Sequence, residues 1–113
     1  MSHLSILPTV LRDADLLVAS LASLKLQPQR GGSVRGFDQE LPVEVRVRLA
    51  DGQDLGWSRQ GDGSLALVGD LQRLSRSRPL QRLVGRITRA YAAHQAVAEA
   101  RALLGDAVVH VRA

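Results

Sequence analysis

Cysteine is absent from this sequence of 113 residues, and aromatic residues are scarce. Without cysteine the chain has no disulfide, no thiol nucleophile and no thiolate ligand for zinc. Phe37, Trp57 and Tyr91 are its only Phe, Trp and Tyr residues. They leave few rings on which the bases of a nucleic acid could stack. Thiol catalysis and cysteine-based zinc sites are therefore excluded.

Long hydrophobic runs are also missing. The stretch LLVASLASL at 16–24 is nine residues long, whereas a membrane-spanning helix needs about 20. No basic region precedes the first apolar stretch, so the N-terminus lacks the pattern of a signal peptide. Because 45% of the residues are apolar, the chain can form a hydrophobic core, and its length fits a single domain over residues 1–113. We expect a soluble, cytoplasmic protein without a membrane segment.

Arginine is abundant, and its distribution is uneven. Fourteen of the 15 basic residues are arginine, and the net charge is +4. Residues 1–70 carry a net charge of −2 and residues 71–113 carry +6, with no acidic residue between Leu71 and Ala98. Such an uneven charge distribution favours association with anions and carries no information about the fold.

Apolar periodicity divides the chain into predicted strands and helices. Strict alternation in VEVRVRL at 43–49, followed by an Asp-Gly turn, predicts antiparallel hairpins. Asp13 suits the N-cap of a first helix, while Pro79 and Gly105 suit the start and the end of a long one. The predicted strands are 3–7, 33–37, 43–49, 54–60, 64–70 and 107–113, and the predicted helices are 14–24, a short turn at 71–76, and 79–105.

This order of elements predicts an α+β fold. Two amphipathic helices would cover one face of an antiparallel sheet, as in a ferredoxin-like or related α/β plait. Val45, Val47, Leu55 and Trp57 would form the inner face of the sheet and meet the helix face that runs from Leu80 to Ala98.

Several segments are similar, in the same order, to one protein family. They are MSHLS at the N-terminus, VRGF at 34–37, DLGW at 54–57, LALVGDL at 65–71 and RITRAYAAHQAV at 86–97. Together they resemble the plastid and cyanobacterial family called hypothetical chloroplast reading frame thirty-five, a domain of unknown function. Leu4 and the segment QRLSRSR at 72–78 depart from that family, which has aromatic residues there. The resemblance implies a small soluble protein of photosynthetic lineages with a maintenance or assembly role, and it brings no activity, cofactor or catalytic residue.

The clearest candidate site is a row of arginines on the long predicted helix. Arg78, Arg82, Arg86 and Arg89 are spaced four, four and three residues apart, which places them along one side of a helix. We call these four residues the arginine row. Three interpretations remain open: a solvated face that keeps the protein in solution, a surface for an acidic protein, and a set of contacts to nucleic-acid phosphates.

Structural roles explain the remaining polar residues better than chemistry does. His3, His94 and His110 lack the spacing of metal ligands, so no metal site is expected. Asp13 and Asp15 suit helix capping better than a pair of catalytic acids. Gly31-Gly32 suits a flexible loop better than a phosphate-binding loop. No nucleophile motif is present, and we expect no catalytic residue and no cofactor.

The sequence thus predicts a non-catalytic interaction or assembly factor and not an enzyme. It would bind an acidic protein through Arg46 and Arg48, which point outward from their strand, or through the arginine row. The alternative is a nucleic-acid-binding module that uses the Arg78–Arg89 helix face. A homodimer through the outer sheet face or through strand 107–113 is a further option.

Overall fold

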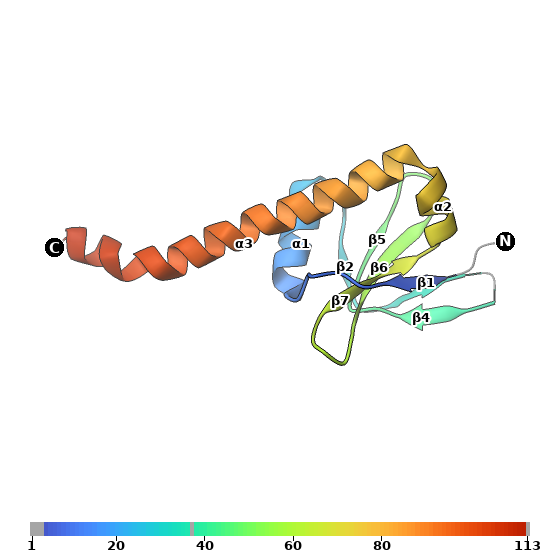
Figure 1. Ribbon diagram of the computed structural model, residues 1–113, viewed down its shortest axis with the longest axis horizontal. Coiled ribbons are helices and arrows are strands. Elements are labelled where there is room, and N and C mark those ends of the chain that lie inside the picture. The colour runs from blue at the N-terminus through green and yellow to red at the C-terminus, as the bar shows by residue number, and fades with distance from the viewer. Residues whose placement is uncertain (1–3, 37, 113) are drawn as a thin grey trace.

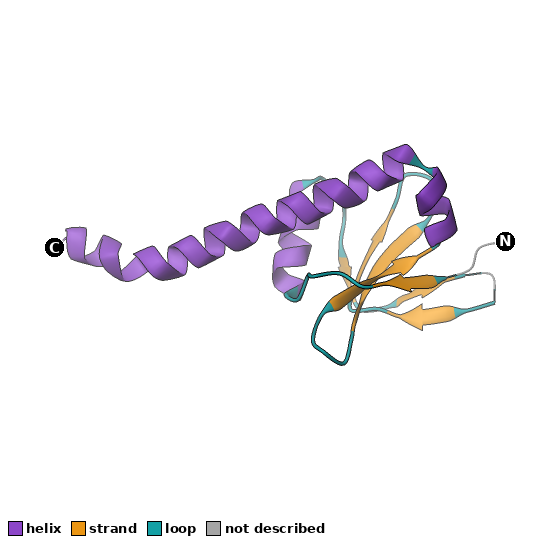
Figure 2. Ribbon diagram, in the orientation of Figure 1, coloured by secondary structure: helices purple, strands orange, loops and turns teal. Residues whose placement is uncertain are grey.

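The computed structural model describes the backbone of residues 4–36 and 38–112, and their side chains except those of Leu71 and residues 105–112. Five strands form an antiparallel sheet in the order β1-β7-β6-β5-β2, and β3 and β4 form a second, two-stranded sheet (Figure 2). The predicted α+β class is confirmed. The elements are β1 (Ser5–Leu7), α1 (Ala14–Ser23), β2 (Gln29–Arg30), β3 (Ser33–Arg35), β4 (Glu40–Pro42), β5 (Val45–Arg48), β6 (Asp54–Arg59), β7 (Leu65–Gly69), α2 (Leu71–Arg76) and α3 (Arg78–Arg112).

The three central strands form the predicted meander. In the antiparallel register of β5, β6 and β7, Val45 lies opposite Trp57, and Trp57 lies opposite Leu67. All three side chains are buried, and Trp57 is 2% exposed. Because side chains alternate across a strand, Arg46 and Arg48 emerge on the opposite face. The alternation in the sequence therefore predicted both the strands and their inward faces.

A bent hairpin, formed by β2 and β3 on one side and β4 and β5 on the other, covers part of the outer sheet face. The predicted strand 33–37 belongs to this hairpin: residues 33–35 form β3, which pairs with β4 and not with the large sheet. Phe37 lies outside the described residues. Gly31 and Gly32 have φ angles of +74° and +87°, which glycine adopts without strain. They allow the bend, which packs Val34 and Val43 against Val68 of β7. The glycine pair is thus the corner of a hairpin and not a flexible loop.

The helices α1 and α3 both lie on the inner face of the large sheet, opposite the bent hairpin, as predicted (Figure 1). Asp13 is the N-cap of α1, and its carboxylate accepts hydrogen bonds from the backbone N–H groups of Asp15 and Leu16. α1 packs against α3, and the two helices close the main core. The buried members of this core are Leu11, Ala14, Leu17, Leu21, Val45, Val47, Leu49, Leu55, Trp57, Leu65, Leu67, Ile87 and Tyr91.

The predicted last strand at 107–113 is wrong, because α3 continues to Arg112. The helix crosses the sheet and then extends far beyond it, so the molecule measures 62 Å along its longest axis (Figure 1). At 1.5 Å per residue, position 107 lies about 24 Å along the helix from Tyr91. A strand at 107–112 would have to reverse direction to reach the sheet. Gly105 does not end the helix, because one glycine inside a helix costs only about 1 kcal/mol.

Candidate interaction surface

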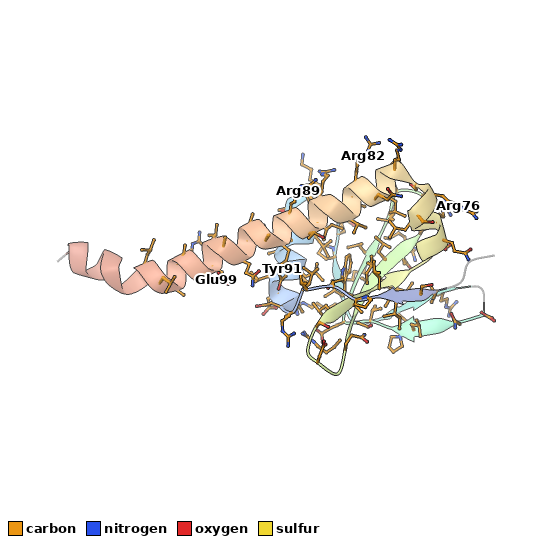
Figure 3. The ribbon with its side chains drawn as sticks, viewed as in Figure 1. Arg76, Arg82, Arg89, Tyr91 and Glu99 are labelled. Carbon is orange, nitrogen blue, oxygen red and sulfur yellow. The ribbon has the colours of Figure 1, made fainter. Side chains whose placement is uncertain are left out.

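The arginine row lies on the side of α3 that faces away from the sheet. All four of its residues are exposed, while Leu80, Leu83 and Val84 are half-buried and Ile87 is buried. Figure 3 shows Arg82 and Arg89 extending from the helix away from the strands. The start of the helix is held by Ser77, whose hydroxyl accepts a hydrogen bond from the Leu80 N–H at 3.2 Å. The row predicted from sequence spacing is therefore a continuous exposed surface.

Ion pairs within the molecule use other arginines. Across the described residues, the carboxylates of Asp15, Glu40, Asp54, Glu44 and Asp51 pair with Arg30, Arg35, Arg48, Arg59 and Arg73, in that order. None of the arginine-row residues forms an ion pair with any part of the chain that the structure describes. The charge of the row is therefore not compensated, whereas the charge of the sheet surface largely is.

Arg46 and Arg48 lie on the opposite side of the sheet from the row. Arg48 contacts both carboxylate oxygens of Asp54, with Nε–Oδ1 and Nη2–Oδ2 distances of 3.0 and 3.3 Å. This hydrogen bonding to Asp54 raises the pKa of Arg48 above its usual value. Arg46 donates to the side-chain oxygen of Gln29 at 2.6 Å. The six predicted partner-binding residues thus form two separate surfaces, because β5 points its arginines outward and α3 covers the inner face.

Two adjoining hollows of about 540 and 490 Å³ lie at the Arg46 and Arg48 side chains. Asp54 lines both hollows, and Glu40 and Asp70 line the larger one. Arginines and carboxylates alternate here, so a bound anion would meet both attraction and repulsion. This surface is a weaker candidate for an acidic partner than the arginine row.

The glycine pair and the first aspartates have structural roles. The Gly31 N–H donates to the Glu44 carbonyl at 2.8 Å, and the Gly32 carbonyl accepts from the Val43 N–H at 3.0 Å. These backbone groups are therefore used within the hairpin. Asp13 caps α1, and Asp15 forms an ion pair with Arg30, so the prediction of capping in preference to paired acids is confirmed for Asp13.

The histidines do not come together in the described structure. His94 is half-buried on α3 and His110 is on the extended part of that helix, while His3 lies outside the described residues. Among the side chains that the structure describes, no three His, Cys, Asp or Glu residues form a group that could hold a metal ion. Among the helices described, none is long and apolar enough to cross a membrane.

Comparison with known proteins places the chain in a family. Residues 20–110 match the family described as "Protein of unknown function (DUF1257)". The chain belongs to this family. No curated protein and no solved structure matches it. In this DUF1257 protein the match includes the bent hairpin, the meander and the arginine row, and it leaves out β1.

One surface of the DUF1257 protein was missed from the sequence. The apolar helix face was expected to remain in contact with the sheet as far as Ala98, but burial ends near Tyr91, and residues 95–104 are all exposed. Val97, Leu103 and Leu104 are 49%, 80% and 56% exposed. Helical periodicity shows which residues share a side of a helix, but it does not show how far the neighbouring sheet extends.

Proposed function

We propose that this protein is a non-catalytic interaction factor that binds an acidic protein through the arginine row. The observation that carries the proposal is the contrast between the two groups of arginines. Five arginines pair with carboxylates within the molecule, and the four of the row do not within the described structure. Guanidinium groups form two-pronged hydrogen bonds with carboxylates, which suits an acidic protein surface.

The residues of the row are also well placed for binding. They lie on the first half of α3, which is anchored to the core by Ile87 and Tyr91. A row on a packed helix keeps its spacing, so a partner does not have to order it. The resemblance noted in the sequence supports a maintenance or assembly role in the cytoplasm of photosynthetic-lineage bacteria.

Nucleic acid is the alternative partner. Phosphate contacts from the row would be independent of base sequence and strongly dependent on salt. Base stacking has little support, because Trp57 and Tyr91 are buried at 2% and 4% exposure. We therefore favour a carboxylate-rich protein and treat nucleic acid as an outcome of the test.

The test compares the wild type with an Arg82→Glu/Arg86→Glu variant. Binding to poly-L-glutamate, tRNA and duplex DNA is measured across a salt series that starts at about 50 mM, where phosphate contacts are strongest. We expect the wild type to bind poly-L-glutamate, and the variant to bind it at least about tenfold more weakly. Pull-down from the host with both proteins then identifies the natural partner.

The matched control is Lys25→Glu/Arg76→Glu, which changes the net charge equally at exposed positions outside the row that form no ion pair within the described structure. If this control lost as much binding as the row variant, total charge and not the row would explain the result. Equal recovery of partners by the wild type and the row variant would show that the arginine row does not bind them. Tight, salt-sensitive binding of tRNA or DNA with weak poly-L-glutamate binding would favour the nucleic-acid alternative.

A further inference from the structure

The second half of α3 extends beyond the rest of the molecule. Figure 1 shows the helix continuing past α1 and past the whole sheet. Residues 92–112 span about 31 Å at 1.5 Å per residue, and residues 95–104 are all exposed. In proteins most of the stability of a helix comes from packing against other elements and not from the propensity of its residues. A contact along this part of α3 would therefore stabilise it.

One side of α3 changes from cationic to apolar along its length. After Arg86 and Arg89, the same side continues through Ala93, Val97, Ala100 and Leu104, at steps of four, four, three and four residues. All four of these residues are exposed. We call them the apolar stripe. Exposed Val and Leu at this spacing are typical of a helix that packs against another helix.

We propose that the apolar stripe binds the same stripe of a second copy of this chain, with the two helices antiparallel. Large and small residues alternate along it, and alanine follows at position 107 and valine at 111. In one antiparallel register, Val97 lies opposite the partner's Ala107, Leu104 opposite the partner's Ala100, and Ala93 opposite the partner's Val111. Each large residue then meets an alanine, so the stripe is complementary to itself, as a two-fold interface requires.

The length of the extended helix agrees with this register. Position 112 of the partner falls opposite Ala92, next to Tyr91, where burial against the sheet and α1 ends. The two helices therefore overlap over their extended parts, and the two sheets lie at opposite ends of the dimer without colliding. A longer overlap would lay the partner helix along the arginine row, because the row lies on the same side of α3 as the apolar stripe.

Charge also favours the antiparallel arrangement. Residues 90–112 contain Glu99, Arg101, Asp106 and Arg112, so their net charge is zero, whereas the arginine row carries +4. A parallel pair would bring two arginine rows side by side, where like charges repel. The antiparallel pair separates the rows and leaves both accessible, so it is compatible with the proposed function and does not depend on it.

Sedimentation equilibrium of the full chain tests the dimer. We expect the wild type to dimerise, and Val97→Glu/Leu104→Glu to dissociate at least about tenfold more readily. The matched control is Ala98→Glu/Ala102→Glu, which adds the same charges on the opposite side of the exposed helix. Near-ultraviolet circular dichroism of Trp57, a core residue, checks that each variant keeps its fold.

Disulfide cross-linking tests the orientation, since the wild type has no cysteine. A mixture of Ala100→Cys and Leu104→Cys proteins should form a mixed disulfide under mild oxidation. Val97→Cys protein should not cross-link to itself, because the two sites would be about 15 Å apart along the axis, beyond the reach of a disulfide. A monomeric wild type, an unaffected Val97→Glu/Leu104→Glu dimer, or efficient Val97→Cys self-linking would each overturn the proposal.

Discussion

The hydroxyl oxygen of Tyr91 on α3 accepts a hydrogen bond from the backbone N–H of Asp13, the N-cap of α1, at 3.0 Å. The same oxygen accepts from the Arg12 N–H at 3.2 Å. One buried side chain thus joins the start of α1 to the last turn of α3 that packs on the core. It satisfies backbone donors that the loop before α1 leaves unpaired.

Replacement of Tyr91 by Phe should destabilise the fold by about 1–3 kcal/mol, because two partly buried N–H groups lose their acceptor. The loss is measured by urea unfolding followed by Trp57 fluorescence. Thr88→Val on the same helix is the control, since the exposed Thr88 hydroxyl donates to the Val84 carbonyl of its own helix and to no other group in the described part of the chain. Equal stability of Tyr91→Phe and wild type would show that water replaces the hydroxyl without cost.

Replacement of Gly56 by Ala should destabilise the protein by about 1–3 kcal/mol, because overpacking forces neighbours apart. An added Cβ would lie 2.5 Å from Val43 Cγ1 and 2.7 Å from Val34 Cγ2. Gly61→Ala is the control, since a Cβ there has no neighbour within 4 Å. Adding Val43→Ala should recover part of the loss, and strictly additive effects would contradict the predicted contact.

Glu40 should titrate below its usual pKa, chiefly because Ser33 donates a hydrogen bond to it and secondly because Arg35 lies nearby. Since the folded-state pKa is depressed, this contribution to stability is present above the unfolded-state pKa and is lost as pH falls through the folded value. NMR titration of the Glu40 carboxyl should show a rise in pKa in Ser33→Ala and also in Arg35→Gln. An unchanged Glu40 pKa in Ser33→Ala would contradict the hydrogen bond as the main cause.

Changes at Gly105 should report on the helix that replaces the predicted last strand. Gly105→Ala should increase helix content, because alanine favours a helix interior over glycine by about 1 kcal/mol, and Gly105→Pro should decrease it. Far-ultraviolet circular dichroism of the full chain measures both. If residues 107–112 formed a strand, Gly105→Ala would add no helix.

Much of the fold follows from patterns over a few residues. The alternation from Val43 to Leu49 predicted β5 and its two faces, and Asp13 was recognised as an N-cap because a short side chain next to a helix start satisfies free N–H groups. The spacing of the arginine row predicted its exposure, because helical neighbours three and four residues apart share a side. These features depend on local geometry, which the order of residues encodes directly.

Other features needed the three-dimensional structure. The last segment, AVVHVRA, alternates like a strand, yet it continues α3 because no sheet edge lies within its reach. Likewise, no local pattern shows that β3 leaves the large sheet at Gly32, or that Arg46 and the arginine row lie on opposite sides of it. Both depend on which distant strands and helices fill the space around them.

The sequence by itself determined the α+β class, the inner and outer faces of the meander and the row of arginines, since each arises from the periodicity of a helix or a strand. It also determined the N-cap at Asp13, which depends only on the side chain next to the helix start. Only the tertiary structure decided which arginines are neutralised, where the core ends on α3 and which apolar residues are left exposed. Those properties depend on distances between residues far apart in the chain, such as Tyr91 and Asp13, and packing sets these distances.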